Sequence, residues 1–141
     1  MAKASSTFNL SSLDTIAACN RPVEIQIKDT NGVPTPFFIS IVGKDSDVYR
    51  GRVRALADDQ IQKQAMGKRS GETIDKLEAK NIDALVAATT GWRLGDGNVV
   101  ELGDEQLEFS AANVRRVYAG LLPVREQVSE AINDLANFMP A

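Results

Sequence analysis

Apolar and polar residues alternate strictly near the start of the chain, over residues 23–28. A period of two is typical of a strand that is buried on one face only. The segment Asp29–Gly32 follows, and its Asn-Gly pair favours a tight turn because both residues accept positive φ angles cheaply. A second apolar run, residues 37–42, follows four residues after the turn, and Pro34 and Pro36 before it predict that the returning strand starts irregularly or lies at an edge. The pattern therefore predicts a β-hairpin over residues 23–42.

Downstream of the hairpin, apolar residues recur at helical spacing instead. One helix is expected from a cap at Asp45 or Ser46 to about Met66, and a second from about Glu72 to Thr89, with a break at 67–71. The residues expected to face inward are Tyr49, Val53, Leu56, Ala57 and Ile61 in the first helix, and Ile74, Leu77, Ile82, Leu85 and Val86 in the second.

The segments around these helices carry weaker signals. Residues 1–8 are mostly small and polar, which predicts disorder, and residues 12–18 predict one or two helical turns capped by a serine. The glycine-bounded segment 91–97 is expected to be a loop. The short apolar runs 99–102 and 107–109 are expected to pair as a small second hairpin.

The last third of the chain predicts two more helices. Ser110 is a suitable cap for a short helix that stops at Gly120, and Pro123 suits the first turn of the final helix. The sequence as a whole therefore predicts an α+β fold that is mainly α. An N-terminal β-hairpin is followed by a bundle of four or five helices with a small second hairpin, and residues 9–141 form a single domain.

The final predicted helix has the cleanest apolar stripe of the chain. Its members are Val124, Val128, Ala131, Ile132, Leu135 and Phe138. The stripe either packs on the chain's own core or contributes some of its residues to an interface with a partner, and the two roles are compatible. We expect Ile132 to be core and Phe138 to be partly interface. The same choice between core and interface applies to the only tryptophan. The candidate protein-binding residues are therefore Val124, Val128, Leu135, Phe138 and Trp92.

The sequence contains few of the side chains that usually carry out catalysis or bind metals. The 141 residues include no histidine, which is the commonest general base and metal ligand, and a single cysteine. Cys19 would lack an imidazole partner as a nucleophile, so a small buried hydrophobe is the better interpretation. We expect no catalytic residues, no metal site and no cofactor.

Charge is distributed unevenly along the chain. Residues 1–70 carry ten Lys and Arg against seven Asp and Glu, whereas residues 71–141 carry six against twelve. Opposed charges of this kind favour self-association, although two solvated faces would give the same count. The overall charge of −3 argues against nucleic-acid binding. No apolar run approaches the ~20 residues of a membrane span, so we expect a cytoplasmic protein without a membrane partner.

The order of these signals resembles one known family. The segments that carry the likeness are Gly43–Asp47 with Tyr49-Arg50, Thr89–Trp92, Leu107–Val114, Leu122–Val128, Ala131–Asp134 and Asn137-Phe138. Together with the hairpin they resemble the tail assembly chaperones of long-tailed bacteriophages. The likeness extends from about Pro22 to Phe138 and includes no catalytic motif.

The resemblance implies a function and a set of partners. Such chaperones are small helical proteins that keep the apolar tape measure protein soluble and help to recruit tail tube subunits. It also implies a protein of the host cell cytoplasm that is absent from the mature virion. The homo-oligomer that we expect rests instead on the opposed charges of the two halves and the apolar stripe of the final helix. The alternative is a structural virion component, such as a tail or head–tail connector subunit. Tube subunits are expected to be mainly β, which favours the chaperone.

Overall fold

The computed structural model describes residues 7–65 and 74–139. The fold is α+β and mainly α, as predicted. The strands are β1 (Val23–Lys28), β2 (Pro34–Ile41), β3 (Thr89–Leu94), β4 (Glu101–Leu102) and β5 (Glu105–Gln106). The helices are α1 (Thr15–Cys19), α2 (Asp47–Ala65), α3 (Ile74–Ala87), α4 (Ala111–Gly120) and α5 (Leu122–Asn133). Two short 3₁₀ helices are η2 (Leu10–Leu13) and η3 (Leu135–Asn137).

The predicted hairpin is confirmed as the antiparallel pair β1–β2. Its inner positions face each other in register, with Val23 opposite Ile41 and Ile25 opposite Ile39. The turn uses Gly32 at a φ of 80°, a conformation that a residue with a Cβ rarely adopts. The alternation in the sequence therefore placed this hairpin correctly.

A third strand, β3, completes the sheet in the order β1-β2-β3. Trp92 lies opposite Ile39, and Leu94 lies opposite Phe37. The prediction of a loop over residues 91–97 is therefore wrong for its first half. The alternation of Trp92 and Leu94 with Arg93 is a strand signal that the glycines on either side obscured.

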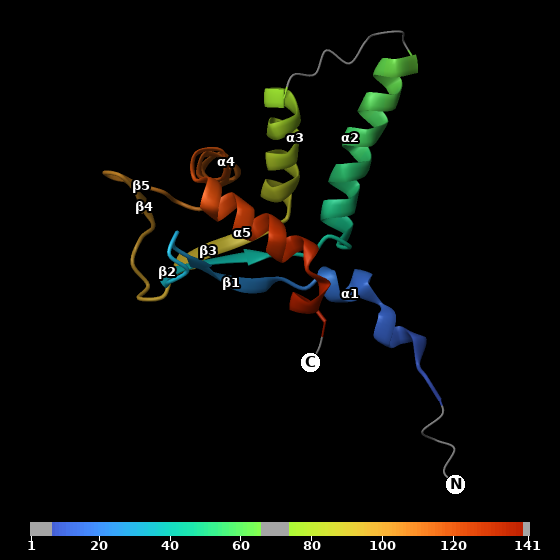
Figure 1. Ribbon diagram of the computed structural model, residues 1–141, viewed down its shortest axis with the longest axis horizontal. Coiled ribbons are helices and arrows are strands. Elements are labelled where there is room, and N and C mark those ends of the chain that lie inside the picture. The colour runs from blue at the N-terminus through green and yellow to red at the C-terminus, as the bar shows by residue number, and fades with distance from the viewer. Residues whose placement is uncertain (1–6, 66–73, 140–141) are drawn as a thin grey trace.

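The helices cover one face of this sheet and extend beyond one end of it (Figure 1). Helix α5 packs on β1, α4 packs on both α5 and α3, and α2 packs on α3. Helices α2 and α3 stand side by side away from the sheet, and the segment before α1 projects from the same end of the molecule (Figure 1). The core lies between the sheet and α3, α4 and α5, with Ile39, Ile41, Val114, Val128 and Ile132 almost fully buried.

The opposite face of the sheet is polar. Arg93 donates two hydrogen bonds to the carboxylate of Glu24, at 2.8 and 2.6 Å, and its guanidinium lies 4.5 Å from the ring centroid of Phe38. The guanidinium lowers the pKa of Glu24 by these hydrogen bonds. Polar and charged side chains therefore occupy much of this face of the sheet.

A buried hydroxyl pair joins α4 to the start of β3. The oxygens of Thr89 and Tyr118 are 2.6 Å apart, and Thr89 also donates to the carbonyl oxygen of Leu85 at 2.8 Å. Because a hydroxyl has one hydrogen, Tyr118 must be the donor within the pair. Burial raises the pKa of Tyr118 to about 12.

The predicted second hairpin exists but is shorter than expected. It pairs Glu101 with Gln106 and Leu102 with Glu105, around a turn in which Gly103 has a φ of 62°. Leu107 lies just outside β5 and is buried in the core. Leu107 therefore anchors the hairpin to the body, and its N–H extends the pairing by one bond to the carbonyl of Val100.

Three helix predictions need correction. The first turns are capped by Asn9 and Asp14, whose side chains accept from the backbone N–H groups of Ser11 and Ala17, and not by a serine. Helix α2 does not bury its predicted inner face, since Val53 and Ile61 are exposed. In α3, Leu77 is also exposed, whereas Ile82 and Leu85 are buried as predicted.

The final helix also ends earlier than its stripe suggested. Helix α5 ends at Asn133, because Asp134 leaves the helical conformation and caps the following turn, η3, through Ala136 N–H. Ser110 and Pro123 are confirmed at the helix starts. The predicted disorder covers residues 1–8, of which only Thr7 and Phe8 are described, and the predicted break at 67–71 lies outside the described residues.

Candidate functional site

An open apolar groove of about 910 Å³ lies at the end of the sheet away from α2. It is bounded by the β1–β2 turn, the segment from β3 to β5, and the α4–α5 junction. Its apolar lining residues are Ile27, Phe37, Leu94, Val99, Val100, Leu102, Leu107, Val117, Leu121, Pro123 and Val124. Three charged residues, Lys28, Asp29 and Glu101, also line it. Its volume is within the usual range of ligand pockets.

Hydrogen bonds fix the segments that form the walls of the groove. Gly95 N–H donates to the carbonyl of Pro36 at 2.7 Å, and Leu107 N–H donates to the carbonyl of Val100 at 2.8 Å. The first bond ties the segment after β3 to β2, and the second extends the pairing of the β4–β5 hairpin. On the other side, the Gln127 amide accepts from Lys28 N–H at 2.7 Å and donates to its carbonyl at 2.8 Å. The groove is therefore a built feature with a fixed frame.

The lining determines what the groove can do chemically. The apolar side chains gain free energy when they are covered, at roughly 25 cal/mol per Å² of apolar surface. Besides the three charged residues, the polar side chains of the lining are those of Thr30, Thr35, Asn98 and Gln106, so apolar residues predominate. The groove is therefore suited to holding apolar side chains of a protein segment.

Two of the sequence-predicted binding residues belong to this region. Val124 is half-buried and lines the groove directly. Trp92 is half-buried behind it, with its ring centroid 5.8 Å from that of Phe37, which lines the groove, and 5.5 Å from that of Phe109. Trp92 thus supports the groove wall from within the sheet.

The other three predicted residues lie elsewhere. Val128 has no exposed surface and Phe138 is only 5% exposed, so both belong to the core. Phe138 closes over Cys19 and Gly43 at the opposite end from the groove. The expectation that Phe138 faces a partner is therefore corrected, because the turn at Asp134 redirects the chain and buries the ring. Leu135 is half-buried and packs against the same core.

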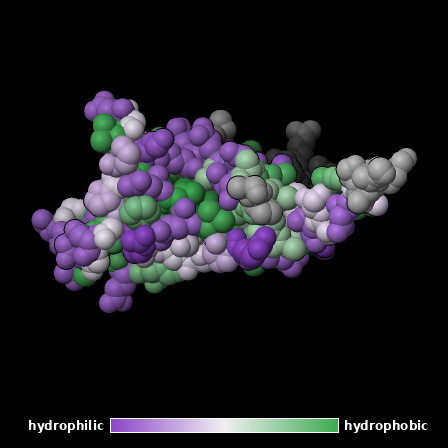
Figure 2. Space-filling view, turned by 90° about the horizontal axis from the view of Figure 1, so that it is seen from below, coloured by the Kyte–Doolittle hydropathy of each residue, from purple (hydrophilic) through white to green (hydrophobic). Residues whose placement is uncertain are grey.

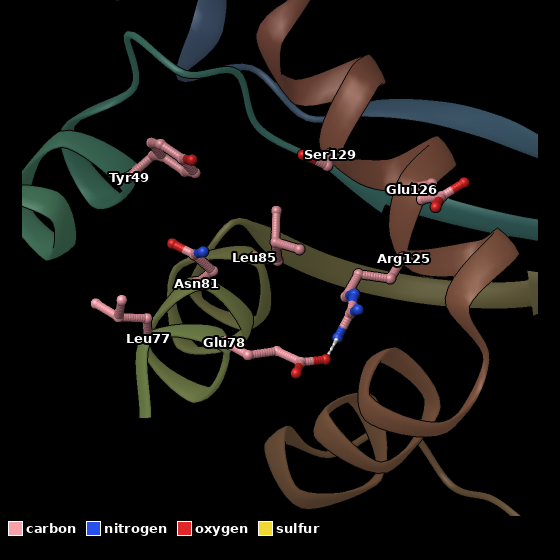
Figure 3. Close-up of a pocket in the computed structure, with 8 residues that line it drawn as sticks. All are labelled: Tyr49, Leu77, Glu78, Asn81, Leu85, Arg125, Glu126 and Ser129. Carbon is pink, nitrogen blue, oxygen red and sulfur yellow. Dashed lines mark hydrogen bonds and ion pairs between the residues drawn. The ribbon is translucent and has the colours of Figure 1, made fainter. Parts of the chain in front are cut away.

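A second, more polar pocket of about 600 Å³ lies among α2, α3 and α5 (Figure 3). Arg125 of α5 donates to Glu78 of α3 at 2.6 Å across one side of it. Tyr49 enters from α2, and burial raises the pKa of its phenol. Glu126 points away from the other lining residues (Figure 3). The ion pair fixes α5 against α3, and we assign no chemistry to this pocket.

Sequence reasoning missed a short arm at the N-terminus, residues 7–13. The arm carries Phe8, Leu10 and Leu13, which are 66, 72 and 63% exposed. Ile16, in the first turn of α1, is also exposed. Leu10, Leu13 and Ile16 follow each other at a spacing of three residues, which is a helical signal. The many serines and small residues nearby concealed it. Seen from below, the surface of the molecule shows hydrophobic patches between hydrophilic ones (Figure 2).

The described part of the chain lacks two kinds of feature. Residues 7–65 and 74–139 contain no group of three or more His, Cys, Asp or Glu side chains placed to hold a metal ion. Within the same residues, no helix combines the length and the apolar character that crossing a bilayer requires. Comparison with known proteins gave no match to a family model, to a curated protein or to a solved structure.

Proposed function

We propose that this chain is a non-enzymatic chaperone of bacteriophage tail assembly, which binds and solubilises the tape measure protein and helps to recruit tail tube subunits. The observation that carries the proposal is the open apolar groove at the α4–α5 junction. A protein that keeps an aggregation-prone partner soluble needs apolar surface that its own fold leaves uncovered. The phage assignment itself rests on the sequence resemblance described above.

The groove fits one helix of an apolar partner better than an extended strand. The Gln127 side chain occupies both backbone groups of Lys28, at the end of the edge strand β1 that lines the groove, so an added strand would find no free partner there. An amphipathic helix needs no such groups and binds through its apolar face alone. The tape measure protein would therefore present one apolar helical face at a time.

The test is co-expression with fragments of a tape measure protein, followed by pull-down. Leu121→Asp places a charge in the groove and should reduce capture at least tenfold, because that charge would be desolvated on binding. Leu122→Asp is the matched control. Leu122 is the next residue, is 48% exposed and does not line the groove, so capture should be unchanged.

Two results would contradict the proposal. Equal capture by both variants, each shown to be folded by circular dichroism, would remove the groove as the binding site. Detection of the chain in purified virions by mass spectrometry would favour the alternative, a structural tail or connector subunit. Absence of the chain from virions, together with capture that depends on Leu121, would support the chaperone.

A further inference from the structure

The arm and the groove are two places where this fold leaves large apolar side chains without cover. The arm exposes Phe8, Leu10 and Leu13, and the groove exposes Val99 and Leu121. They lie at opposite ends of the molecule (Figure 1). The arm of one copy therefore cannot reach its own groove.

We propose that the arm, residues 7–13, docks into the groove of a second copy of this chain. The arm is shaped for docking before it binds, because Asn9 caps η2 by accepting from Ser11 N–H at 3.0 Å. Pre-ordering reduces the conformational entropy that binding would otherwise cost. None of the residues of η2 is buried in its own chain, so this order serves no packing within the copy.

The base of the arm is held firmly by the body. The Thr15 hydroxyl donates to the carboxylate of Asp45, and Ala18 and Cys19 are buried in the core. Asn20 and Asp47 exchange two hydrogen bonds, at 2.8 and 3.1 Å. The arm therefore leaves the body in a set direction, away from the groove.

Charge agrees with this pairing. Residues 7–13 contain no charged side chain, and neither do the residues that form the α4–α5 side of the groove, Val117, Leu121, Pro123 and Val124. Docking therefore places no charge from the arm in an apolar site, where an unpaired charge would oppose binding strongly.

The area involved indicates how tight the contact is. Covering Phe8, Leu10 and Leu13 removes on the order of 300 Å² from water on the arm side. A stable interface buries about 800 Å² per partner, so the arm supplies less than half of what a permanent complex needs. Association through the arm is thus weak and reversible.

The contact joins unlike surfaces at opposite ends of the molecule, so it repeats head to tail along a row of copies.

Docking of the arm involves no tape measure protein, so its test needs only the purified chain. Sedimentation velocity from low to high micromolar concentration should show the wild type growing beyond a dimer. Leu13→Asp in the arm and Val99→Asp in the groove should each raise the dissociation constant at least tenfold. Ile61→Asp is the matched control, because Ile61 is 62% exposed on α2, far from both surfaces, and its variant should associate as the wild type does.

A mixing experiment tests the direction of the contact. Leu13→Asp keeps an intact groove and Val99→Asp keeps an intact arm, so the mixture should form dimers and nothing larger. A strictly monomeric wild type, or equal association by Leu13→Asp and Ile61→Asp, would overturn the inference. Failure of the mixture to form dimers would overturn it as well, and none of these results bears on capture of the tape measure protein.

Discussion

The two ends of the apolar core differ in how completely they are covered. At one end Phe138 closes over Cys19 and Gly43, and all three are buried. At the other end the same core continues into Val117, which is buried, and Val124, which is half-buried at the edge of a groove of about 910 Å³. Similar apolar residues are covered at the closed end and remain partly exposed at the open end.

This difference arises from the path that the chain takes after each helix. After α5 the chain turns at Asp134 and returns a large aromatic ring to the core. After α4 it passes straight through Leu121 into α5, and within residues 7–65 and 74–139 no further segment covers the junction. The groove therefore stays open where the described chain has no further segment to close the core.

The largest expected effect compares one residue from each end. Phe138→Ala should lower the free energy of unfolding by about 3–5 kcal/mol, because it removes a buried ring and leaves a cavity. Val124→Ala should cost about 1 kcal/mol or less, since the valine is already half-exposed. Urea unfolding followed by circular dichroism measures both. Equal costs would mean that the groove end is packed as firmly as the closed end.

Alkaline pH should probe the covered core through Tyr118. Its pKa is raised from about 10 in the unfolded chain to about 12 in the fold, so the unfolded state loses its proton first. The stability associated with the neutral phenol is present below pH 10 and is lost as pH rises towards 12. The loss should reach at most about 2–3 kcal/mol.

Tyr118→Phe should flatten this part of the stability profile, whereas Tyr49→Phe should change it less because Tyr49 is only half-buried. Denaturant unfolding at a series of pH values is the measurement. A profile that keeps its slope in Tyr118→Phe would assign the alkaline transition to other groups.

The smallest expected effect concerns two glycines. A Cβ on Gly43 would overlap the side chain of Cys19 and lie 3.0 Å from the Phe138 ring, so Gly43→Ala should cost about 1–3 kcal/mol. Gly51 lies inside α2 with open space around it, and Gly51→Ala should gain about 0.5–1 kcal/mol. Thermal melting of both variants sharpens the comparison. A neutral Gly43→Ala would show that the closed end can relax.

The sequence placed most of the elements because their signals are local. The alternation over residues 23–28, the cap at Ser110 and Pro123 in the first turn of α5 all act within a few residues. The strand β3 was missed because glycines flank Trp92 and its pairing partner, β2, lies about fifty residues away. Periodicity also identifies an apolar face without showing which segment covers it, and for this reason Phe138 was assigned to an interface.

The groove could not have been predicted from sequence by the same reasoning. Its walls come from the β1–β2 turn, the β3–β5 segment and the α4–α5 junction, which meet only in the folded chain. Val124 was found because it lies on a regular stripe, whereas Val99 lies in an irregular segment with no period to mark it. Helical spacing did mark Leu10, Leu13 and Ile16, but no local signal could show that the arm remains uncovered.

The position of Trp92 makes it a built-in optical reporter. It is the only tryptophan, and its indole touches Phe37, one of the residues that line the groove. Occupation of the groove would exclude water from the surroundings of the Trp92 indole. Its fluorescence would then shift towards the blue, with no added dye. The same signal would report an arm, a client helix or a competing peptide in real time, from a residue that does not itself line the groove.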